Sequence, residues 1–102
     1  MEVRLLYFDD CPNWRLAEAR LHEALDGIDD ERPAVTYELV STPEQAERAG
    51  FRGSPTILVN GADPFAGPDD PVGLSCRLYR SPAGVDRAPT VEQLRSVLAD
   101  AR

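Results

Sequence analysis

Asp10-Cys11-Pro12-Asn13-Trp14, which closes one apolar run, and Gly50-Phe51-Arg52-Gly53-Ser54-Pro55-Thr56, which opens another, are the stretches that decide the fold. The first places a cysteine where a strand gives way to a helix, and the unpaired N–H groups of a helix start favour a thiolate. The second has the form of a proline loop that leads into a strand. Together they indicate an α/β chain that carries a cysteine at a helix start and a proline loop before a strand.

Hydrophobic periodicity outside these stretches predicts the order β-α-β-α-β-β-α. The first strand is a short apolar run, which is the pattern expected of a central strand that is covered on both faces. Thr42 with Gln45 and Thr90 with Gln93 are capping-box pairs that mark the starts of two helices. The expected strands are residues 3–8, 34–40, 56–59 and 74–79, and the expected helices are 12–28, 43–49 and 91–101.

A long proline-rich loop, residues 61–73, separates the third expected strand from the fourth. Loops of this length without secondary structure are usually functional or disordered. Phe65 and Val72 give this one side chains to pack with, so we expect it to be ordered.

Composition limits the classes of function. The 102 residues form one expected domain, 1–102, and the net charge of −7 with no lysine argues against nucleic acid or an anionic membrane as partner. The sequence has no spanning apolar stretch and no signal-peptide pattern, so we expect a cytoplasmic protein. In a reducing compartment, two cysteines are more often reactive, metal-binding or buried than structurally bridged. A single histidine makes a zinc site hard to assemble, and we expect no metal and no cofactor.

The order of elements and the two stretches resemble the thioredoxin-like superfamily over nearly the whole chain. The resemblance implies a mixed four-stranded central sheet flanked by helices, with a cis Pro55 facing a nucleophilic Cys11 across a substrate groove. It also implies that the backbone of Ser54 hydrogen-bonds an extended thiol-bearing partner. Trp14 stands where dithiol members have their second cysteine, so only a monothiol mechanism or a remote second thiol remains.

Several side chains beside Cys11 have two readings. The helix start and Arg15 favour its thiolate, whereas Asp9 and Asp10 oppose it, so we expect a thiol of moderate reactivity and not a vestigial one. Trp14 either extends the apolar face of the helix or lines the groove. Pro12, Trp14, Arg52 and Ser54 are the expected groove residues.

Cys76 has two readings as well. Alternation along residues 74–79 places it with Leu74 and Leu78 on the apolar side, which predicts a buried core cysteine. In the simple thioredoxin topology the start of this strand also lies at the pole opposite Cys11. Alternatively, the loop before it folds back over the groove and brings Cys76 close to Cys11, as a resolving thiol or half of a soft-metal site.

Three functions follow. The first is an atypical thiol–disulfide oxidoreductase with Cys11 as nucleophile, acting on a thiol- or disulfide-bearing protein or a small thiol. The second is a non-catalytic binding module on the same fold. The third is soft-metal or organometal handling by Cys11 and Cys76. The sequence leaves the physiological substrate and the oligomeric state open.

Overall fold

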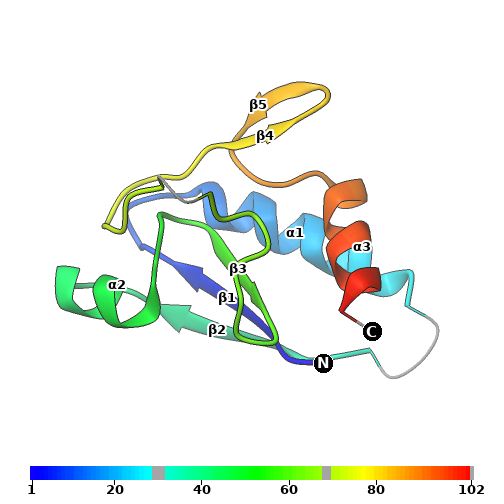
Figure 1. Cartoon of the computed structure of the whole chain (residues 1–102), viewed down its shortest axis with the longest axis horizontal. Coiled ribbons are helices and arrows are strands. Elements are labelled where there is room, and N and C mark those ends of the chain that lie inside the picture. The colour runs from blue at the N-terminus through cyan, green and yellow to red at the C-terminus, as the bar shows by residue number, and fades with distance from the viewer. Residues whose placement is uncertain (29–31, 68–69, 102) are drawn as a thin grey trace.

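The computed structural model describes residues 1–28, 32–67 and 70–101 (Figure 1). Within these residues the elements alternate between strands and helices up to β3, and a short hairpin then precedes the last helix. The elements are β1 (Val3–Tyr7), α1 (Asn13–Asp26), β2 (Val35–Leu39), α2 (Pro43–Ala49), β3 (Thr56–Val59), β4 (Tyr79–Ser81), β5 (Gly84–Asp86) and α3 (Val91–Asp100).

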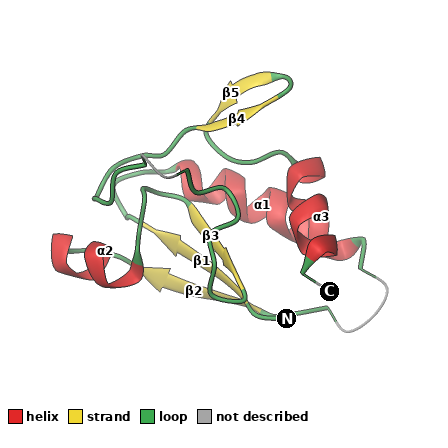
Figure 2. Cartoon of the chain, viewed as in Figure 1, coloured by secondary structure: helices red, strands yellow, loops and turns green. Residues whose placement is uncertain are grey.

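The main sheet has the order β2-β1-β3, so β1 is its central strand, as the sequence predicts (Figure 2). β2 runs parallel to β1, with Val3 opposite Val35, and α1 connects the two strands. β3 runs antiparallel to β1, with Leu5 opposite Ile57. The sheet is therefore mixed. Because the C-terminal end of β1 lies beside the start of β3, residues 8–11 come close to residues 53–56.

Side chains pack on both faces of this sheet because β1 and β3 are largely apolar, with Arg4 and Thr56 as the charged and polar exceptions. One cluster joins strand residues such as Leu5 and Ile57 to α1 and α3, with Leu21 and Leu94 fully buried. The second cluster lies on the other face and includes Leu6, Val40, Ala46, Phe51 and Leu58. Ala46 places α2 in this second cluster, so α1 and α3 cover one face of the sheet and α2 contacts the other.

Both capping boxes predicted from the sequence are present. The Thr42 and Thr90 side chains accept hydrogen bonds from the backbone N–H groups of Gln45 and Gln93, at 3.1 and 3.0 Å. Gly50 ends α2 in the left-handed conformation, with φ of 66°. These local signals fix the boundaries of α2 and the start of α3.

The expected four-stranded central sheet is wrong. Within the part of the chain described, the expected strand 74–79 contributes one isolated bridge, between Ser54 and Cys76, and adds no fourth strand to the sheet. The regular pairing starts later, where β4 and β5 form a hairpin that stands apart from the main sheet (Figure 1). The hairpin turns at residues 82–83, and Gly84, the first residue of β5, has φ of 120°, a conformation that L side chains rarely adopt.

The loop after β3 begins with a tight turn. Asn60 and Gly61 have φ of 53° and 81°, and the Val59 N–H donates to the Ala62 carbonyl at 2.8 Å. Further along, the Arg52 guanidinium donates to the Gly67 carbonyl at 2.7 Å, which ties the loop back to the start of the second motif. The ordered loop expected over residues 61–73 is thus tethered at Gly67, while its residues 68–69 lie outside the described residues. None of the helices formed by the described residues is long and apolar enough to cross a membrane.

Candidate functional site

The two cysteines form a disulfide. Cys11 and Cys76 are 65 residues apart in sequence, and their Cα atoms are 5.7 Å apart. The chain after the long loop has folded back to the start of α1, which is the less favoured of the two readings of Cys76. The bond pairs Cys11 with a sulfur from a distant part of the chain.

Cys11 is held at the end of a turn between β1 and α1. Its N–H donates to the Phe8 carbonyl at 3.0 Å, and Pro12 follows as the N-cap residue of α1. The residue is 1% exposed, and its sulfur lies 3.7 Å from the Ser54 carbonyl oxygen. The sulfur therefore lies at the helix start, as the sequence predicts, but the proline loop covers it and it is shielded from solvent.

Cys76 is exposed, so the expectation of a buried core cysteine is wrong. The alternation runs in the opposite phase: Arg77 and Tyr79 are 7% and 5% exposed, whereas Leu78 is 65% exposed. Arg77 and Tyr79 find polar partners inside the protein, and this interior pairing turns Cys76 and Leu78 outward.

The Ser54–Pro55 peptide bond is cis. The backbone groups of Ser54 are already paired within the chain: its N–H donates to the Ser75 carbonyl at 2.7 Å, and its carbonyl accepts from the Arg77 N–H at 2.9 Å. The expected role of Ser54 as a hydrogen-bonding edge for an extended partner is therefore taken by the protein's own residues on either side of Cys76. We call residues 73–79 the Cys76 segment.

A buried ion pair anchors the Cys76 segment. Arg77 donates to the Asp63 carboxylate at 2.7 Å, and both side chains are less than a tenth exposed. The Arg77 guanidinium also lies 4.5 Å from the centre of the Tyr79 ring, in cation–π geometry. Arginine is seldom buried unless it is paired, and Asp63 supplies the partner here.

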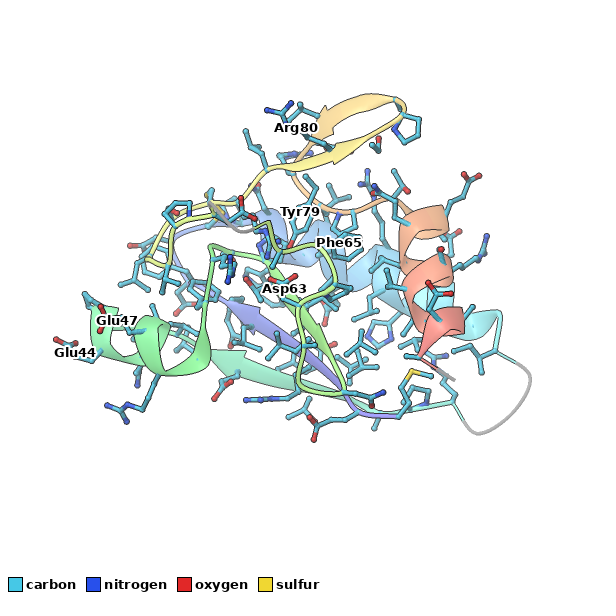
Figure 3. All side chains as sticks on the ribbon, in the orientation of Figure 1. Glu44, Glu47, Asp63, Phe65, Tyr79 and Arg80 are labelled. Atoms are coloured by element: carbon cyan, nitrogen blue, oxygen red, sulfur yellow. A yellow bond between two sulfur atoms is a disulfide. The ribbon has the colours of Figure 1, made fainter. Side chains whose placement is uncertain are left out.

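Tyr79 connects the Cys76 segment to the proline loop. Its hydroxyl donates to the Pro55 carbonyl at 2.5 Å, and its ring meets Phe65 edge to face at 5.5 Å. Figure 3 shows the Asp63, Phe65 and Tyr79 side chains gathered in one region, where the loop after β3 passes β4. Burial raises the pKa of Tyr79 well above its usual value, so the hydroxyl stays a donor.

The other expected groove residues serve different contacts. Trp14 is half-buried, and its ring lies 4.6 Å from that of Tyr7, so it borders the main core. Arg52 is half-buried and directed to the loop carbonyl of Gly67. Pro12 is exposed at the helix start.

Sequence reasoning missed two residues that position the site, Asp63 and Gly53. Gly53 has φ of 112°, and a Cβ atom there would lie 2.9 Å from the Arg77 Cβ, so the close approach of the two segments requires glycine. A buried arginine implies an acidic partner, which is the only signal that points to Asp63.

Comparisons with protein families, curated proteins and solved structures found no match.

Proposed function

We propose that this protein is a thiol–disulfide oxidoreductase of the thioredoxin-like type whose redox pair is Cys11 and Cys76. The disulfide between the start of α1 and the Cys76 segment, with the Cys11 sulfur 3.7 Å from the Ser54 carbonyl oxygen of the proline loop, is the observation that carries the proposal. The bond also favours a dithiol mechanism over a monothiol one, because a second sulfur lies within bonding distance. The partner is a protein or small molecule that carries a thiol or a disulfide.

The reaction is a two-electron exchange. The bridged protein takes up two electrons and two protons from two thiol groups, which leave as a disulfide, and the protein is left with two free thiols. The reverse reaction reduces a partner disulfide and restores the bridge. No cofactor is needed, since the electrons pass directly between sulfur atoms.

The experiment compares reduction of the native bond with reduction of the same bond in the unfolded chain. The oxidised protein is incubated with glutathione at pH 7, with and without urea, and free thiols are counted by alkylation and mass spectrometry. A redox-active bond is reduced at least as fast in the native protein as in urea. A bond that glutathione reduces only after unfolding is structural, and that result would falsify the proposal.

Soft-metal handling is a second candidate, because it requires two sulfurs within a few ångströms of each other and the disulfide meets that condition. Thiolates select soft cations such as Cu(I), which accept two sulfur ligands. The described residues include no group of three or more His, Cys, Asp or Glu side chains placed to hold a metal ion, so a two-sulfur site is the form to test. One equivalent of Cu(I) added to the reduced protein should protect both cysteines from alkylation, and protection of neither excludes this function.

The non-catalytic binding module remains the alternative from another class. It predicts that both thiols of the reduced native protein react no faster than buried thiols. The redox proposal predicts rapid alkylation of at least one thiol, so the same alkylation measurement separates the two.

A further inference from the structure

The two cysteines of the bridge differ in their exposure to solvent. Cys11 is 1% exposed, whereas Cys76 is an exposed residue, as are its neighbour Ser75 and the outward-facing Leu78. Resting on the proposed function, we infer that Cys76 is the sulfur that exchanges with the partner and that Cys11 is the buried leaving and resolving sulfur. This order reverses the one implied by the family resemblance, which makes Cys11 the nucleophile.

The stereochemistry of disulfide exchange favours this order. A thiolate attacks one sulfur in line with the S–S bond, from the side opposite the sulfur that leaves, so the attacked sulfur must be accessible. The burial of Cys11, with its sulfur 3.7 Å from the Ser54 carbonyl, closes the approach to it. The exposed side of Cys76 leaves an approach open.

The position of Cys11 also suits a leaving sulfur. It lies two residues before Asn13, the first residue of the 14-residue helix α1, whose positive end favours a negative charge. A sulfur that carries negative charge more readily leaves faster. Once the bond is broken and the sulfur protonated, the Ser54 carbonyl is close enough to accept an S–H hydrogen bond.

The exchange balances as follows. A partner thiolate attacks the Sγ atom of Cys76, a mixed disulfide forms between the partner and Cys76, and the electron pair of the broken bond goes to the Sγ atom of Cys11. A second partner thiolate then attacks the partner's own sulfur and releases Cys76 as a thiolate. In the reverse direction, the Cys76 thiolate attacks the partner disulfide, and Cys11 displaces the partner from Cys76.

The Cys76 segment has anchors other than the disulfide. The backbone pairs between Ser54 and residues 75 and 77, together with the Arg77–Asp63 ion pair, fix both sides of Cys76. The two reduced sulfurs therefore stay close, and Cys11 can displace a partner from Cys76 without a search by the chain. Because the segment occupies the backbone groups of Ser54, the partner reaches Cys76 from its exposed side.

The test traps the first product of exchange. The oxidised full chain is mixed with glutathione, quenched in acid at early times and digested with pepsin, and the peptide that carries glutathione is identified by mass spectrometry. We expect glutathione on Cys76 at least about tenfold more often than on Cys11. Glutathione mainly on Cys11 would overturn the assignment while leaving the redox proposal intact. A native bond that is not reduced at all refutes the redox proposal itself and, with it, the assignment.

Two single-thiol variants give an independent measurement. Cys11→Ser keeps Cys76, and Cys76→Ser keeps Cys11; each is reacted with glutathione disulfide in buffer and in urea. In buffer, Cys11→Ser should form the mixed disulfide at least about tenfold faster than Cys76→Ser, and the two rates should converge in urea, where access no longer differs. Equal rates in buffer contradict the assignment. Should Cys76→Ser loosen the Cys76 segment and expose Cys11, the trapping experiment on the wild-type chain still decides.

Discussion

Arg77 and Asp63 form a buried ion pair one residue after the disulfide, with side chains 7% and 8% exposed. Asp63 lies in the loop after β3, and Arg77 lies in the Cys76 segment, so the pair holds the two parts of the chain together beside Cys76. The pair is therefore part of the scaffold of the site.

Replacing Asp63 by Asn leaves the Arg77 charge buried without a counter-charge. Breaking a buried pair in this way costs about 3 kcal/mol of unfolding free energy. Urea unfolding of the oxidised protein measures this cost, and Asp9→Asn, which removes the same charge from an exposed position, is the matched control. Equal stability of the two variants would show that the ion pair contributes nothing.

Gly53→Ala tests whether the close approach of the two segments controls the bridge. The added Cβ atom would lie 2.9 Å from the Arg77 Cβ and 3.1 Å from the Ser75 carbonyl oxygen, so the Cys76 segment must shift. We expect a loss of about 1 to 3 kcal/mol in stability and a shift of the glutathione equilibrium toward the reduced protein.

Gly50→Ala is the control for this variant, because its φ is also positive, at 66°, but nothing lies within 4 Å of the added atom. It should cost roughly 1 kcal/mol through backbone strain and leave the glutathione equilibrium unchanged. An equal shift of the equilibrium in both variants would trace the effect to general destabilisation and not to the position of Cys76.

The bridge should stabilise the fold substantially. A bond that closes 65 residues restricts the unfolded chain, which corresponds to about 4 kcal/mol in the loop-entropy treatment. Urea unfolding of the oxidised protein and of the Cys11→Ser/Cys76→Ser double variant measures the difference, and the reduced wild-type protein should resemble the double variant. Identical unfolding midpoints would contradict this prediction and would mean that the protein without the bridge gains other contacts of equal stabilising effect.

The buried hydroxyl of Tyr79 leads us to expect that the free energy of unfolding falls at alkaline pH. Burial raises its pKa in the folded state, so the folded protein retains a proton that the unfolded chain releases above about pH 10. Stability is therefore complete below pH 10 and falls as the pH rises above it, by at most about 1.4 kcal/mol per pH unit for this one group.

Tyr79→Phe should remove this part of the pH dependence and lower stability at pH 7 by about 1 kcal/mol, because the hydrogen bond to Pro55 is lost. Tyr37→Phe is the comparison: burial, with Glu18 nearby, raises the pKa of Tyr37 to about 12, yet this residue is 41% exposed, against 5% for Tyr79. Urea unfolding of both variants, from pH 8 up to the highest pH at which the protein is still folded, measures the pH dependence that each tyrosine contributes. An unchanged pH profile for Tyr79→Phe would assign the alkaline loss to other groups.

The sequence predicts the elements up to β3 well, because their signals are local. β1 is apolar except for Arg4, α1 follows a helical apolar period, and the capping box at Thr42 defines the start of α2. Pro55 could be singled out because a proline before an apolar strand is itself a strong local pattern.

Residues 74–79 resisted prediction because local alternation there fits two phases equally. Leu74, Cys76 and Leu78 make one apolar face, and the opposite phase buries Arg77 and Tyr79. The choice depends on Asp63, which neutralises Arg77 from 14 residues away, and on the Pro55 carbonyl, which accepts from Tyr79. The pairing of Cys76 with Cys11 follows from the same choice.

The bridge also has a consequence for how the protein is made. Cys11 belongs to the first turn after β1, whereas Cys76 and its anchor Arg77 are synthesised 65 and 66 residues later. A growing chain can therefore pack β1 against α1, β2 and β3 while its only cysteine is still unpaired. Bridge formation comes after the long loop has been completed and folded back, so the oxidation state of Cys11 during synthesis reports whether the last third of the chain has reached its place.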